Sequence, residues 1–138
     1  MSFRYKSALL SLVSLLAIYG YYFTRVVSAV HFGGHIGNPV GLLLGIVVAI
    51  VVVQIVGHAI IAATSAERYA RMDERERGFD RRATTVGYYL LIVCTLAATA
   101  TLHIGATRPM MANAILLAIV IAECVRQAVF LALHHRAA

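Results

Sequence analysis

Tryptophan is absent from this chain of 138 residues, and cysteine and proline occur only twice each. Cys94 and Cys124 have no CxxC spacing, which argues against a disulfide exchanger and predicts two buried small side chains. Charged residues are also scarce, at 13% of the chain, whereas a soluble domain has about 25%. The chain therefore has too little polar surface to enclose an ordinary soluble core.

Hydrophobic residues make up 61% of the chain, and the mean hydropathy is +0.83. Four apolar runs are each long enough to span a bilayer, and they cover about 8–30, 39–63, 84–105 and 111–133. These runs predict an all-α, multi-pass membrane protein with one domain over 1–138, a four-helix bundle of two hairpins. No room remains for a soluble catalytic domain, so an enzyme is not expected.

One polar stretch, residues 64–83, separates the two predicted hairpins. It holds six of the twelve basic residues and five of the six acidic ones. The positive-inside rule places this loop, Arg4, Lys6 and Arg136 in the cytoplasm, so both termini are predicted to be cytoplasmic. The first apolar run contains Arg25 and exceeds the length of a signal-peptide core, which predicts that it is retained as a span.

The centre of this loop alternates in sign along Asp73, Glu74, Arg75, Glu76 and Arg77. Glu67 with Arg71, and Asp73 with Arg77, have the i,i+4 spacing of helical ion pairs. We therefore expect a solvated helical stub that continues from the second span and meets a cytoplasmic protein partner. Anionic lipid headgroups account for the basic excess, and nucleic acid is not expected as a partner.

The two hairpins resemble each other in sequence. His35-Ile36-Gly37 in the first outer turn corresponds to His103-Ile104-Gly105 in the second, and Gln54 corresponds to Glu123 at a spacing of 69 residues. A parallel internal repeat would place Gln54 and Glu123 at the same depth. Small residues at Gly41 and Gly45 are typical of close helix contacts, within one chain or in a homo-oligomer.

Among the polar residues inside the predicted spans, five are candidates for a site: Gln54, His58, Glu123, Arg126 and Gln127. Counting along the fourth run places Glu123 near the midplane, where an isolated charge costs at least about 2.5–3.5 kcal/mol. If the hairpins pack as repeats, the five side chains converge. They then form either a structural ion pair between Glu123 and Arg126, or an ion, proton or solute site in which Glu123 titrates and His58 relays protons.

Three histidines, His31, His35 and His103, belong to the outer turns. Three imidazoles are enough for a zinc or copper ion, and an axial pair could hold haem. No carboxylate lies nearby to orient them, and histidines that cap helix ends are the alternative. A metal ion or haem is thus one possible cofactor.

The segment Met72-Asp73-Glu74-Arg75-Glu76-Arg77, followed by Arg81-Arg82 and Gly87-Tyr88-Tyr89, resembles an uncharacterised family of small bacterial four-helix integral membrane proteins. That family carries an Asp-Glu-Arg-Asp/Glu motif before its third span. Its last span often has a glutamate followed three residues later by a basic residue, as Glu123 and Arg126 are here. The resemblance covers most of 40–136, implies a bacterial inner (cytoplasmic) membrane, and implies no activity.

Three functional hypotheses follow. The first is a non-enzymatic membrane protein, homo-oligomeric, with an interaction or regulatory role. The second is a small transporter or channel for an ion, proton or solute that works through the intramembrane polar residues. The third is a carrier of a metal ion or haem at the outer histidines.

Overall fold

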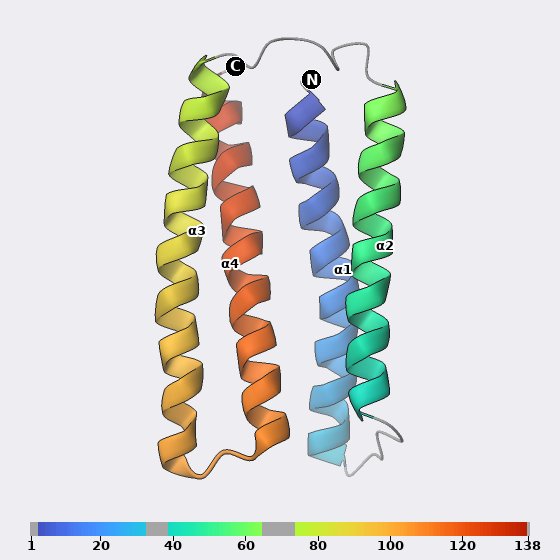
Figure 1. Ribbon diagram of the computed structural model, residues 1–138, viewed down its shortest axis with the longest axis vertical. Helices are drawn as coiled ribbons and strands as arrows, with labels where there is room; N and C mark the ends of the chain where they lie inside the picture. The colour runs from blue at the N-terminus through green and yellow to red at the C-terminus, as the bar shows by residue number, and fades with distance from the viewer. Residues whose placement is uncertain (1–2, 33–38, 65–73, 138) are drawn as a thin grey trace. The chain divides into compact units, whose positions relative to one another are not determined.

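A computed structural model describes residues 3–32, 39–64 and 74–137, and the regular structure within these ranges is helical throughout. The structure has four long helices: α1 (Phe3–Phe32), α2 (Pro39–Thr64), α3 (Glu74–Ala100) and α4 (Arg108–Ala137) (Figure 1). The shortest, α2, has 26 residues and is about 39 Å long. All four are long and apolar enough to cross a membrane, which confirms the expected helical class and the expected number of segments able to span.

The chain divides into two compact units, Met1–Tyr69 and Ala70–Ala138. Each unit holds one antiparallel helical hairpin, α1 with α2 and α3 with α4 (Figure 1).

In the first unit, one face of α1 is buried. The buried residues follow the three-and-four spacing of a helix stripe: Ala8, Ser11, Leu15, Tyr19 and Tyr22. Helix α2 contributes Ile46 and Ile50 to the same core, and Gly57 lets the side chain of Leu10 approach the α2 backbone. Most other residues of α2 are apolar and exposed, as expected for a helix that faces lipid.

In the second unit, small residues bring α3 and α4 close together. Ala83, Gly87 and Ala98 are the buried residues of α3. A Cβ at Gly87 would lie 3.0 Å from the Cβ of Arg126 and 3.3 Å from the carbonyl oxygen of Ala122. Because Gly87 has no side chain, α4 can pack closely against α3 next to Ala122 and Arg126.

A tight turn joins these two helices. Helix α3 runs into a short 3₁₀ helix, η2 (Thr101–Ile104), which ends at Gly105 with φ of 81°. The N–H groups of Gly105 and Ala106 donate to the carbonyls of Leu102 and Thr101 at 3.3 and 3.2 Å. Glycine is the residue that adopts this left-handed conformation without strain, and Pro109 then fits the first turn of α4.

The charged segment differs from the expectation. We expected the third span to begin near residue 84, but α3 begins at Glu74, so the described charged residues form its first turns. They continue into the third span instead of extending the second, because α4 offers them partners. Glu76 lies 3.6 Å from His134, and Asp80 lies 3.9 Å from Arg126. Residues 65–73, including Asp73, lie outside the described residues.

Gly87→Val tests the close approach of α3 and α4. We expect it to lower the free energy of unfolding by about 1–3 kcal/mol, because the new Cβ meets backbone and Cβ atoms of α4. Gly78→Val is the matched control. It carries the same helix-propensity cost on the same helix, and no described atom lies within 4 Å of its Cβ position. Denaturation in mixed micelles, followed by circular dichroism, measures both, and equal losses would contradict the packing described.

Candidate functional site

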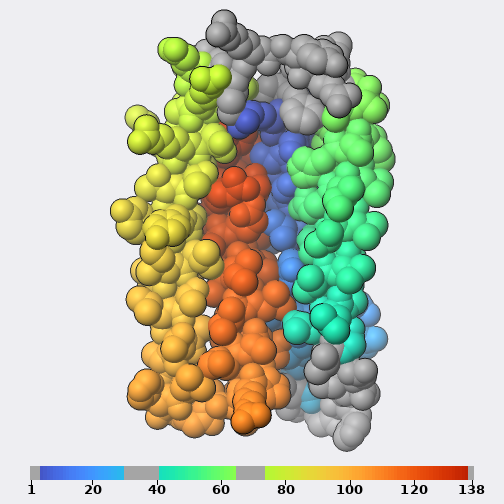
Figure 2. All heavy atoms as spheres, in the orientation of Figure 1, coloured from blue at the N-terminus to red at the C-terminus, as the bar shows by residue number. Residues whose placement is uncertain are grey.

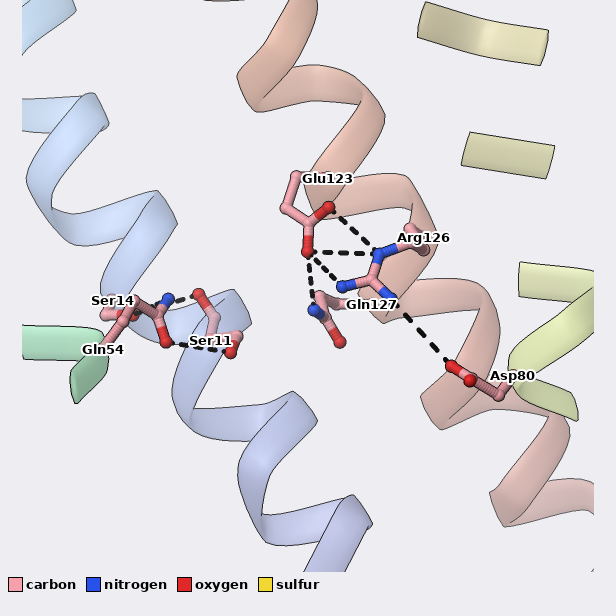
Figure 3. Close-up of polar contacts among 7 residues, drawn as sticks. All are labelled: Ser11, Ser14, Gln54, Asp80, Glu123, Arg126 and Gln127. Atoms are coloured by element: carbon pink, nitrogen blue, oxygen red, sulfur yellow. Dashed lines mark hydrogen bonds and ion pairs between the residues drawn. The ribbon is translucent and has the colours of Figure 1, made fainter. Parts of the chain in front are cut away.

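The carboxylate of Glu123 is held by two side chains of its own helix (Figure 3). Arg126 Nε donates to Oε1 at 3.2 Å and to Oε2 at 3.0 Å, and Arg126 Nη2 donates to Oε1 at 2.5 Å. Gln127 Nε2 donates to Oε1 at 2.8 Å. These residues lie three and four positions after Glu123, on one face of α4, so the helix itself supplies the donors.

Arg126 also reaches the neighbouring helix. Its Nη1 lies 3.9 Å from Oδ1 of Asp80 on α3. One guanidinium therefore lies between two carboxylates and links α3 to α4, as Figure 3 shows. The side chains are only partly covered, with exposed fractions of 33% for Arg126, 36% for Glu123 and 41% for Asp80.

The packing at Gly87 sets the level of this network along α3. The Cβ position of Gly87 lies next to Ala122 and Arg126, so the network is level with the first residues of the apolar part of α3. Gly87 is 13 residues from Glu74 and 13 from Ala100, the two ends of α3, so this contact lies midway along the helix. The depth of Glu123 in a membrane stays a prediction.

A groove of ≈ 240 Å³ opens beside the ion pair, between α3 and α4. Its walls are Thr84, Gly87, Tyr88 and Leu91 from α3 and Ile119, Ala122, Glu123 and Arg126 from α4. The groove is mostly apolar, and the ion pair forms a polar part of its wall. Its volume is below the range of about 300–1,000 Å³ that is typical of sites for drug-sized molecules.

The first unit contains a second polar network, which consists of uncharged groups (Figure 3). Gln54 Oε1 accepts a hydrogen bond from Ser11 Oγ at 3.1 Å, and Gln54 Nε2 donates to Ser14 Oγ at 3.2 Å. Ser14 Oγ in turn donates to the carbonyl of Ser11 at 3.1 Å. His58 Nδ1 donates to the carbonyl oxygen of Gln54 at 2.7 Å. Both ends of the Gln54 amide are therefore bonded to α1.

Sequence reasoning missed Ser11, Ser14 and Asp80. The two serines lie one helical turn apart in an otherwise apolar run, which is a pattern that could have indicated partners for Gln54. Asp80 was assigned only to the charged loop. The structure places Gln54 and His58 in the first unit, and Glu123, Arg126 and Gln127 in the second. The convergence of all five stays a prediction.

The histidines and cysteines are not assembled into a described site. His103 is exposed in η2, the side chain of His31 is outside the described part of the chain, and so is the whole of His35. Among residues 3–32, 39–64 and 74–137, no group of three or more metal-ligating side chains is close enough to hold an ion. The metal or haem site therefore stays a prediction. Cys94 and Cys124 are free thiols and half-buried, less covered than expected.

Arg126→Gln tests what the ion pair contributes. We expect it to lower the free energy of unfolding by about 1–3 kcal/mol, because Glu123 loses its charged donor while remaining partly buried. Glu123→Gln together with Arg126→Gln is expected to recover part of this loss, since neither charge is then left alone. Unfolding of the four proteins of this double-mutant cycle in micelles measures the coupling, and strictly additive losses would contradict it.

Comparisons of the chain with protein-family models, with curated proteins and with solved structures found no match. The function therefore has to be argued from the geometry of the two hairpins.

Proposed function

We propose that the chain is a non-enzymatic integral membrane protein that acts by associating with other helices in the bilayer, foremost those of its own copies. The observation that carries this proposal is the bonding of Glu123, whose carboxylate receives its donors from Arg126 and Gln127 on the same helix. An ionised group in lipid needs partners, and these partners come from its own hairpin. The network then serves to join α3 to α4.

The outer faces of the helices are the surfaces that remain for association. On α2, Gly41, Gly45 and Ala49 are exposed, whereas Ile46 and Ile50 pack on α1. No described atom lies within 4 Å of the Cβ position of Gly45. Small exposed residues allow the backbones of two helices to approach closely in lipid, which supports contact with a second copy of the chain. In Figure 2, α2 is drawn in teal to green spheres.

The location and orientation belong to the same proposal. The bacterial inner membrane, with both termini in the cytoplasm, is supported by the charge distribution and by the resemblance described above. In this orientation the exposed first residues of α3, Glu74, Arg75 and Arg77, would meet a cytoplasmic protein partner.

An internal repeat is supported by the two networks. Ser11 and Asp80 are 69 residues apart, as are Gln54 and Glu123. Ser11 bonds to Gln54, and Asp80 pairs with Arg126, the partner of Glu123. Residues related by one spacing thus take part in a polar network in each hairpin, which supports the repeat.

A second candidate function is the transport of a proton, ion or solute through Glu123. The observation that favours it is the groove, because Glu123 lines it and keeps 36% of its side-chain surface exposed. The bonding to Arg126 and Gln127 opposes it, since a transporting carboxylate must exchange these donors for its ligand.

Gly45→Leu tests association. We expect self-association in lipid bilayers to weaken by about tenfold or more, equivalent to about 1–2 kcal/mol, because the larger side chain holds the helices apart. Single-molecule photobleaching in bilayers, over a range of protein densities, measures this constant. Gly20→Leu is the matched control on α1, where the Cβ position is equally open among the described residues. A monomeric wild-type protein, or equal weakening by both variants, would overturn the proposal.

Glu123→Gln separates the two candidate functions. For an association protein we expect wild-type and variant proteoliposomes to dissipate a pH gradient no faster than empty liposomes. A wild-type flux that Glu123→Gln abolishes and Glu76→Gln retains would instead support transport, since both variants remove one carboxylate from the second hairpin. A dye that reports internal pH measures the flux.

A further inference from the structure

The groove between α3 and α4 has a polar end and an apolar end. Thr84 and the Glu123–Arg126 pair lie at the end of the groove nearest the charged turns of α3. Leu91 and Ile119 line the opposite end, which is apolar. The groove thus changes from polar to apolar along α3. The hairpin changes in the same direction, because its charged residues are at the start of α3 and its apolar residues follow.

Two arginines extend this groove on α3. Arg77, Arg81, Thr84 and Tyr88 are spaced by four, three and four residues, so they share one face of the helix. Both arginines are exposed. Asp80 lies four residues before Thr84, and its carboxylate pairs with Arg126 of α4. The described charges at this end of the hairpin leave a small positive excess, with five arginines against four carboxylates: Arg75, Arg77, Arg81, Arg82 and Arg126, against Glu74, Glu76, Asp80 and Glu123. Three of these carboxylates, Glu76, Asp80 and Glu123, lie against His134 or Arg126 of α4.

We propose that this groove binds an anionic phospholipid, with one acyl chain in the groove and the headgroup phosphate at Arg77 and Arg81. The site lies outside the interface proposed for α2, so the two proposals can fail independently. Charge complementarity selects the occupant, because guanidinium groups bind phosphate and basic residues beside a span attract anionic lipid.

The size and direction of the groove fit one lipid chain. At ≈ 240 Å³ it has the volume of roughly eight water molecules of about 30 Å³ each, which suits a chain segment and not a whole helix. Thr84 and Leu91 are separated by two helical turns, about 10 Å along α3. Tyr88, which is 60% exposed, lines the groove about two helical turns beyond Arg81, and tyrosines are common where the bilayer meets water.

The absence of tryptophan from the chain allows a direct test, because one introduced tryptophan is then the only one. Tyr88→Trp places the probe on the groove wall, and Tyr89→Trp is the matched control, since Tyr89 is 64% exposed and does not line the groove. Each full-length variant is reconstituted in phosphatidylcholine vesicles that contain a minor fraction of phosphatidylglycerol with brominated acyl chains. The bromines quench tryptophan fluorescence on contact.

We expect the brominated phosphatidylglycerol to quench Tyr88→Trp well beyond its share of the bilayer, with a preference of about fivefold for each arginine that contacts phosphate. Quenching of Tyr89→Trp should follow the bulk composition. Adding Arg77→Gln and Arg81→Gln to Tyr88→Trp should remove the preference. Adding Arg82→Gln should leave it, because Arg82 lies about 100° around α3 from Arg81.

Four results would overturn the proposal. Brominated phosphatidylcholine quenching Tyr88→Trp equally well would show a lipid-facing surface without anionic selection. Equal quenching of both probes would mean that the groove holds no lipid of its own. Protection of Tyr88→Trp from both lipids would indicate a second protein in the groove. Loss of the preference on adding inorganic phosphate would identify a free phosphate site instead of a lipid site.

Discussion

Satisfaction of polar groups in lipid is the constraint on which both hairpins depend, because a bilayer offers no water to replace a missing partner. In the second hairpin, one guanidinium group is the partner of two carboxylates. Arg126 bonds both carboxylate oxygens of Glu123 and reaches Asp80 on α3. In the first hairpin, the amide of Gln54 is hydrogen-bonded to the two serines of α1. Each network binds its two helices to each other.

In the second hairpin, the close approach of α3 and α4 and the ion pair between Arg126 and Asp80 depend on each other. Arg126 can reach Asp80 because Gly87 lets α4 lie against the α3 backbone at the same level. The small residues that permit this contact, Gly87 and Ala122, also form the floor of the groove, whose larger walls stand on either side. The feature that stabilises the hairpin thus creates a narrow apolar channel next to charged side chains, and this combination suits an amphiphile.

Sequence patterns within a single helix predicted the structure better than inferences about contacts between helices. The second apolar run was expected over 39–63, and α2 covers Pro39–Thr64. The spacing of Glu123, Arg126 and Gln127 indicated a shared face, and all three are bonded together. The third apolar run was expected to begin near residue 84, whereas α3 already begins at Glu74, and its charged turns include Glu76 and Asp80, which lie near His134 and Arg126 of α4. Hydropathy alone cannot show such partners.

The sequence by itself determined that this chain is helical and carries four segments able to span a membrane, because hydrophobicity and residue spacing are properties of each segment alone. It also determined which polar residues share a helix. Only the tertiary structure decided that Ser11 bonds Gln54, that Asp80 pairs with Arg126, and that Gly87 lies against Ala122 and Arg126. The register between two antiparallel helices depends on how their small side chains interlock, and this is a property of the pair.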